Sequence, residues 1–246
     1  MKKTLYFLLF FISTNTSANI VMTGSRIVYN EGKEFVNVQL NNKSDKVFFV
    51  QSWTENNDKP SEKIEETPYA VIPPIAKLEA NTGQVIRAVL IDKQAFSDDR
   101  ESVSYFNFLQ VPANTDVTDG NEDNNKLVIT IKHKVKLFYR PKKIANYQTN
   151  WAQDIQLDVL EYNNKTLQLR VTNNRPLYLS MSGVAKLEYG DTKLASAGLM
   201  VAPYSYQDFE FISDFGNDLS STPANFTFSS VNDQGGLTER KYPLYF

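Results

Sequence analysis

The sequence predicts an all-β protein made of two immunoglobulin-like β-sandwich domains. Three observations favour this class: short β-like runs recur along the chain, turn-forming residues separate them, and no long amphipathic helical pattern interrupts them. The chain has 246 residues, which is enough for two domains of ordinary size. Hydrophobic residues make up 41% and charged residues 22%, so the chain can bury a core and does not have a disordered composition.

The N-terminal segment has the layout of a secretory signal peptide. Lys2 and Lys3 precede an apolar run from Leu5 to Ile12, and small residues end at Ala18, which predicts export with cleavage after Ala18. A membrane-spanning helix needs about 20 apolar residues, and no segment approaches that length, so we expect no membrane-embedded part. Cleavage removes two lysines and no acids, which changes the formal net charge from −2 to −4. Neither nucleic acid nor an anionic membrane is an expected partner.

The composition also limits catalysis and metal binding. Cysteine is absent and His133 is the single histidine. Disulfides and thiolate metal sites are therefore excluded, one chain cannot assemble a histidine cluster, and we expect no metal and no cofactor. A Ser-His-Asp triad would have to use His133. The carboxylates could in principle supply a glycosidase pair, but none has a recognisable setting, so an enzyme is not expected.

The strands of the first half are predicted by alternation and by the turn residues between them. Phe48, Val50 and Trp53 are expected in the core of one of these strands, and Pro73 or Pro74 could follow a cis bond, although trans is the commoner state. The expected strands are Ser25 to Tyr29, Glu34 to Leu40, Lys46 to Trp53, Val85 to Ile91, Val103 to Val111 and Leu127 to Tyr139.

A second series of β-like runs follows Pro141. Because proline cannot donate to a β-ladder, Pro141 is a natural exit from the first sandwich. We therefore expect an N-terminal domain of residues 19–143 and a C-terminal domain of residues 144–246. The expected strands of the second domain are Ile155 to Tyr162, Thr166 to Thr172, Leu177 to Leu187, Gln207 to Ile212 and Asn225 to Val231.

The last strand of the first domain carries two chemistries along one extended segment. Apolar and basic residues alternate there, so each kind falls on its own face of the strand. An ordinary half-buried strand has this pattern, and so does a template that pairs with a strand of another chain and binds its carboxylate. Periodicity alone favours the ordinary strand. The apolar set is Leu127, Ile129 and Ile131, and the basic set is Lys132, Lys134 and Lys136.

Short motifs spread over both halves complete the pattern. They are Gly24-Ser25-Arg26, Ile72-Pro73-Pro74, Lys77-Leu78-Glu79, Asp99-Arg100-Glu101-Ser102, Tyr105-Phe106-Asn107, Val111-Pro112, Lys136-Leu137-Phe138-Tyr139-Arg140-Pro141 and Ser213-Asp214-Phe215-Gly216. Together they resemble the PapD-like periplasmic pilus chaperones of the chaperone–usher pathway. The chain lacks the cysteine pair of that family's long-loop branch, while its polar loop from Pro112 to Asn125 is long for the short-loop branch, so the pilus type stays open.

The resemblance implies a fold and a function. The two domains meet at an angle with a cleft between them, and the protein works in the periplasm without catalytic turnover. It binds, folds and stabilises pilus (fimbrial) subunits by donor-strand complementation and delivers them to an outer-membrane usher. The free protein could also self-associate through its exposed apolar edge.

The same resemblance assigns roles to residues. Leu127, Ile129 and Ile131 form the donor strand that enters the open groove of the subunit. Arg26 and Lys136 hold the subunit's C-terminal carboxylate in the cleft. Glu101, Arg140 and Asp214 form an interdomain ion network. The alternative is a secreted two-domain adhesin or carbohydrate-binding module, which would not require Arg26 and Lys136 to share a cleft.

Overall fold

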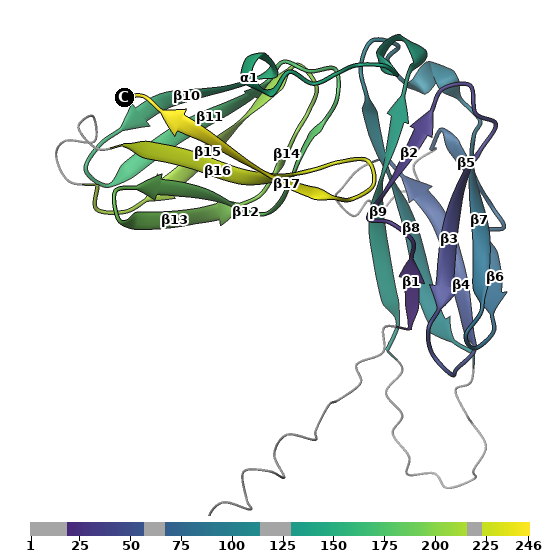
Figure 1. Ribbon diagram of the computed structural model, residues 1–246. Helices are drawn as coiled ribbons and strands as arrows, with labels where there is room; N and C mark the ends of the chain where they lie inside the picture. The colour runs from purple at the N-terminus through teal and green to yellow at the C-terminus, as the bar shows by residue number, and fades with distance from the viewer. Residues whose placement is uncertain (1–18, 57–66, 114–128, 216–222) are drawn as a thin grey trace, which may run out of the picture.

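The computed structural model describes residues 19–56, 67–113, 129–215 and 223–246. Over these ranges the chain forms two β-sandwiches that meet in an L shape, the first containing strands β1 to β9 and the second strands β10 to β17 (Figure 1). The helical elements of the described residues are the short turns η2 (Lys93–Ala95), η3 (Lys142–Ile144) and α1 (Trp151–Asp154). The predicted all-β, two-domain fold is confirmed. No helix of the described ranges is long and apolar enough to cross a membrane.

The first sandwich packs a sheet of order β1-β3-β7-β5 against a sheet of order β2-β9-β8-β4-β6. The first two strands lie in different sheets, and the chain crosses between them at Gly24, whose φ of 90° is readily adopted by glycine. The strands are β1 (Ile20–Met22), β2 (Arg26–Asn30), β3 (Val36–Asn42), β4 (Phe48–Glu55), β5 (Tyr69–Ile72), β6 (Ile75–Leu78), β7 (Gly83–Leu90), β8 (Ser102–Pro112) and β9 (Ile131–Arg140).

Strand β4 shows how alternation assigns residues to the core or to the outer face. Phe48 and Val50 are buried in the core, as predicted. Trp53 is half-buried on the other face, so the prediction that it is a core residue is wrong. The reason is that side chains alternate between the two faces of a strand. In β4 the even-numbered residues face the core, so the odd-numbered Trp53 lies on the outer face.

The peptide bond between Ile72 and Pro73 is cis.

The second sandwich packs a three-stranded sheet of order β10-β11-β15 against a sheet of order β13-β12-β16-β17, with β14 beside β12. Its core combines aliphatic residues of β11 with phenylalanines of β15 and β16. Strands β13, β14 and β17 were not predicted from the sequence. The strands are β10 (Ile155–Tyr162), β11 (Thr166–Asn173), β12 (Leu179–Tyr189), β13 (Thr192–Ala197), β14 (Met200–Val201), β15 (Ser205–Ile212), β16 (Ala224–Val231) and β17 (Leu237–Leu244).

Each sandwich contains one buried asparagine that binds neighbouring loops in the same way. Asn42 ends β3 and Asn173 ends β11, and both side chains are inaccessible to solvent or nearly so. The carbonyls within hydrogen-bond distance of the amide nitrogen are those of Lys46 (2.7 Å), Leu78 (3.3 Å) and Glu79 (2.9 Å) for Asn42, and those of Leu177 (2.9 Å), Val201 (3.2 Å) and Ala202 (3.0 Å) for Asn173. A buried carbonyl without a donor is costly, so these amides stabilise the loops.

A carboxylate on β4 holds the outer face of β9 in place. Glu55 binds Lys132 at 3.0 Å and Lys134 at 2.9 Å and accepts a hydrogen bond from the indole of Trp53 at 2.9 Å. The two ammonium groups lie 4.9 Å from the ring centre of Trp53 and 5.2 Å from that of Tyr105, respectively. Burial would raise the pKa of Glu55, but the hydrogen bonds from Trp53, Lys134 and Lys132 outweigh it and lower the pKa to about 2.

We expect Asn42→Ala to lower the free energy of unfolding by about 1–3 kcal/mol, because it leaves buried carbonyls without a donor. Urea titration followed by tryptophan fluorescence measures this value. Asn37→Ala is the matched control, because Asn37 is an exposed residue of the same strand, and it should change the free energy of unfolding by less than about 0.5 kcal/mol. Equal values for the two variants would contradict the role of Asn42.

We expect Glu55→Gln to be less stable than the wild type at pH 6 and to lose less stability on acidification. A carboxylate whose pKa falls from 4.5 to about 2 on folding stabilises the protein above pH 4.5, and this contribution disappears as the pH falls towards 2. Urea midpoints measured at pH 6 and at pH 3 test this. Glu79→Gln, which removes an exposed pair with Lys77, should follow the wild type.

Candidate subunit-binding edge and interdomain cleft

Strand β9 is paired unequally on its two sides. Strand β8 pairs antiparallel with residues 131–139, whereas β2 pairs in parallel only with Lys136 to Arg140. Among the described residues, no strand pairs with residues 131–135 on the β2 side. We call residues 131–135 the open edge. Its backbone donors and acceptors are available to a strand of another molecule.

The inward face of β9 passes gradually from the core to solvent. Leu137 is fully buried, and Val135 packs against the rim of the core. Ile131, on the same face at the start of β9, is 41% exposed, and Ile129, which precedes the strand, is 65% exposed. Leu127, the third residue of the predicted donor strand, lies outside the described residues. The apolar residues of this segment therefore continue beyond the part that the core of the first sandwich covers.

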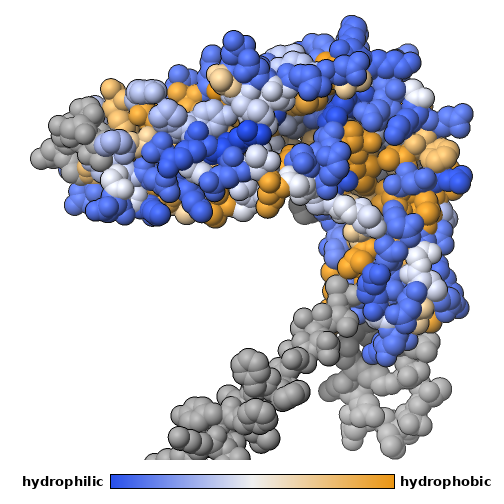
Figure 2. All heavy atoms as spheres, viewed as in Figure 1, coloured by the Kyte–Doolittle hydropathy of each residue, from blue (hydrophilic) through white to orange (hydrophobic). Residues whose placement is uncertain are grey.

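Arg26 and Lys136 are direct neighbours on β2 and β9. They are register partners in the parallel pair, so their side chains leave the sheet on the same face. That face looks into a cavity of about 470 Å³ between the domains, whose other wall is formed by residues 180–183 of β12 and by Leu237. Figure 2 shows the concave side of the L that the two domains form. The structure thus brings together the two cations that the sequence assigns to one cleft.

Arg26 is held by the C-terminal domain and by its own sheet. Its Nη1 donates to the carbonyl of Val231 at 3.3 Å, and the guanidinium lies 5.7 Å from the ring centre of Phe138. Burial lowers the pKa of Arg26, an effect opposed by the charges of Asp233 and Glu101. The group stays charged at neutral pH, and it is only partly solvated, which strengthens its attraction for an anion.

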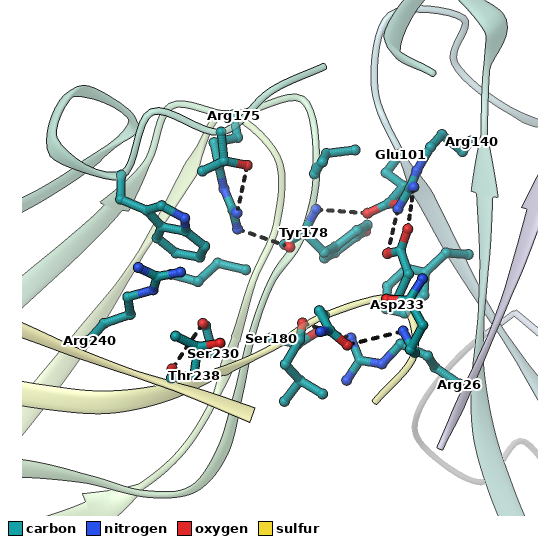
Figure 3. Close-up of a pocket in the computed structure, with 18 residues that line it drawn as sticks. Arg26, Glu101, Arg140, Arg175, Tyr178, Ser180, Ser230, Asp233, Thr238 and Arg240 are labelled. Atoms are coloured by element: carbon teal, nitrogen blue, oxygen red, sulfur yellow. Dashed lines mark hydrogen bonds and ion pairs between the residues drawn. The ribbon is translucent and has the colours of Figure 1, made fainter. Parts of the chain in front are cut away.

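A second arginine joins the two domains (Figure 3). Arg140, on β9, donates from Nε and Nη2 to one oxygen of Glu101 at 3.0 and 2.6 Å. The same guanidinium binds both oxygens of Asp233, in the β16–β17 turn, at 2.6 and 2.9 Å. The other oxygen of Glu101 accepts from the backbone N–H of Tyr178 at 2.9 Å. We call Glu101, Arg140 and Asp233 the junction triad.

The junction triad is largely shielded from water. Side-chain exposure is 4% for Glu101 and 12% for Arg140, against 44% for Asp233. Burial raises the pKa of Glu101, whereas the hydrogen bonds from Arg140 lower the pKa of Asp233. Because burying charged groups costs desolvation, such a network is weak evidence for net stability.

Asp214 does not take the place predicted for it. The carboxylates that bind Arg140 are those of Glu101 and Asp233. Asp214 is exposed just after β15, beside the β10–β11 turn, where the N–H of Phe215 donates to the carbonyl of Asn164 at 3.0 Å. The opposite end of β15 faces the junction, about 25 Å away for eight extended residues.

Asp233 was missed because nothing in the sequence links it to Arg140. Its local signal is the turn-forming run that follows the strand ending at Val231, with two successive glycines after Gln234. This signal marks a turn, but it does not show which end of the sandwich carries the turn. Only the arrangement of the two domains brings it to Arg140.

Comparison with known proteins agrees with this geometry. A family model described as "Pili and flagellar-assembly chaperone, PapD N-terminal domain" matches residues 19–145, and one described as "Pili assembly chaperone PapD, C-terminal domain" matches residues 150–242. The chain is 32% identical over 215 residues to chaperone protein HifB of Haemophilus influenzae, covering 85% of this chain and 86% of that protein. It is 31% identical over 228 residues to the probable fimbrial chaperone YadV of Escherichia coli, covering 92% of this chain and 90% of that protein.

The solved structures show the same architecture. The crystal structure of the YadV chaperone superposes with a TM-score of 0.74 at 28% identity, covering 92% of this chain and all of that one. The two family models match the two domains in order, and one solved chaperone structure covers both. The chain belongs to the PapD family of pili assembly chaperones.

Proposed function

We propose that this protein is a periplasmic chaperone that binds, folds and stabilises pilus subunits by donor-strand complementation and passes them to an outer-membrane usher. One observation carries the proposal: the open edge of β9 runs directly into the paired cations Arg26 and Lys136. The names of two relatives, a chaperone protein and a probable fimbrial chaperone, support it. The role requires binding and release, and it uses no catalytic residue, metal or cofactor.

The open edge supplies the affinity. A subunit that lacks one strand exposes a hydrophobic groove, and β9 completes its sheet with backbone hydrogen bonds. Ile129 and Ile131, together with Leu127, fill the groove, and each fully buried aliphatic side chain contributes about 1.5–3 kcal/mol. A shift of one residue would turn this face outward, so the pairing needs a fixed register.

Arg26 and Lys136 supply the register. The C-terminal carboxylate of the subunit binds between the forked donors of the guanidinium and the compact ammonium group. Both cations lie at the point where β2 begins to pair with β9, so the carboxylate marks the end of the open edge. The junction triad keeps the opposite wall of the cleft at a constant position.

The remaining features follow the same proposal. The chain is exported with cleavage after Ala18, and its domains are residues 19–143 and 144–246. In the free protein the open edge is a site for self-association. An adhesin or carbohydrate-binding module would instead bind a glycan without any subunit, which a glycan array on the free protein would reveal.

We expect Arg26→Ala and Lys136→Ala each to weaken subunit binding by about 30-fold or more, because the carboxylate loses a desolvated partner. Co-expression with a candidate pilin in a periplasm and purification through a tag on the pilin measures the yield of the one-to-one complex. Arg170→Ala is the control, because Arg170 pairs with Asp208 on the outer face of the second domain. Wild-type yields from both cleft variants would rule out the anchor.

We expect Ile131→Asp to abolish the complex while the free protein stays folded. A carboxylate cannot enter the apolar groove of a subunit, but Ile131 is 41% exposed in the free chain. Val85→Asp is the matched control, because Val85 is 38% exposed on β7 in the opposite sheet. Circular dichroism checks the fold of both variants. Equal yields of complex from the Ile131→Asp and Val85→Asp variants would show that β9 is not the donor strand.

A further inference from the structure

A second cavity, of about 270 Å³, lies beside the junction triad (Figure 3). It adjoins the cleft cavity lined by Lys136, since Arg26, Ser180 and Val231 line both, but Lys136 does not line it. Its charged lining consists of the four arginines Arg26, Arg140, Arg175 and Arg240 and the two carboxylates Glu101 and Asp233. The lining therefore carries a formal charge of +2.

Three of the four arginines lie outside the ion pairs of the junction triad. Both carboxylates bind Arg140. Over the described ranges, Arg26, Arg175 and Arg240 have no carboxylate within the 4.0 Å of an ion pair. Figure 3 places Arg175 and Arg240 on the second-domain side of the cavity, across from Arg26.

Arg175 is buried, and its hydrogen bonds go to neutral groups, while the charges of Asp154 and Glu101 act on it from further away. It is 5% exposed, and its Nε donates to the side-chain oxygen of Asn173 at 2.9 Å and its Nη2 to the carbonyl of Tyr178 at 3.0 Å. Its guanidinium lies 4.9 Å from the ring centre of Trp151, and that of Arg240 lies 4.0 Å from the same ring. Burial lowers the pKa of Arg175, yet a guanidinium keeps its proton. Two guanidinium groups thus lie against one indole, and neither forms an ion pair with a carboxylate of the described residues.

Three buried polar atoms at this cavity have no hydrogen-bond partner among the described residues. They are Nε of Arg26, Nε of Arg240 and Oγ of Ser180. All three can donate a hydrogen bond. Buried donors without an acceptor are unfavourable, and they are rare in folded proteins unless a ligand or water completes them.

We propose that this cavity binds a small divalent oxyanion of the phosphate or sulfate type. A dianion cancels the charge of +2 and offers several acceptor oxygens to the three unpartnered donors. The cavity has the volume of about nine waters, which leaves room for such an anion with part of its hydration shell. Because Arg26 belongs to the first domain and Arg175 and Arg240 to the second, the bound anion links the two domains of the free chaperone.

Thermal unfolding of the free protein with inorganic phosphate tests the proposal. At phosphate about five-fold above its Kd, we expect the Tm to rise by about 2–4 °C over sodium chloride of equal ionic strength. Sulfate should act like phosphate, and acetate should have little effect. Isothermal titration with phosphate should give one site per chain. Equal Tm values in phosphate and chloride, or equal shifts with phosphate and acetate, would overturn the proposal.

Variants locate the site. Arg240→Gln should lose the phosphate-induced shift, whereas Arg170→Gln, which removes an arginine of the outer face, should keep it. If Arg240→Gln does not fold, Ser180→Ala takes its place. This smaller change removes one donor, and it should weaken phosphate binding several-fold. Wild-type phosphate binding in every folded cavity variant would overturn the assignment. The free protein is used throughout, so failure here is distinct from failure to bind a subunit.

Discussion

Arg140 forms the ion pair that joins the two domains. One guanidinium donates to a carboxylate from each domain, and the first-domain carboxylate also accepts from the backbone of the second domain. The fork of the guanidinium restricts the angles at which both carboxylates can bind. The turn that carries Asp233 also carries the carbonyl of Val231 that binds Arg26. The junction triad therefore lies where the domains meet, and its Asp233 is on the same turn that contacts Arg26 at the cleft.

Strand β9 combines three tasks because its two faces and its two ends differ. Its inward face anchors the first sandwich at Leu137 and presents apolar side chains at Ile131. Its outer face carries Lys136 in the cleft and Arg140 in the junction triad. Near its start, Lys132 and Lys134 are bound to Glu55 on β4, which keeps an incompletely paired strand attached to its sheet. The open edge is thus held by β8 on one side and by ion pairs of its outer face, while its other side has no strand among the described residues.

Local charge at the junction is opposite in sign to the charge of the whole chain. The sequence has a formal net charge of −2, which predicts no long-range attraction for anions. The interdomain cavity nevertheless brings two guanidinium groups together around Trp151. Low solvation there strengthens the electrostatic attraction of each group for an anion. Anion binding in this protein is therefore a property of how the domains meet and not of its overall composition.

The sequence by itself determined the fold class and most of the strands, because alternation and turn residues act over a few neighbouring positions. It also brought Arg26 and Lys136 to one cleft, although only through resemblance to a family. It placed Trp53 in the core, where one step of alternation decides the face, and it named Asp214 where Asp233 binds Arg140. Strand pairing, the open edge and the partners of Arg140 were decided by the tertiary structure alone, because they join residues far apart in the chain through contacts that no local pattern encodes.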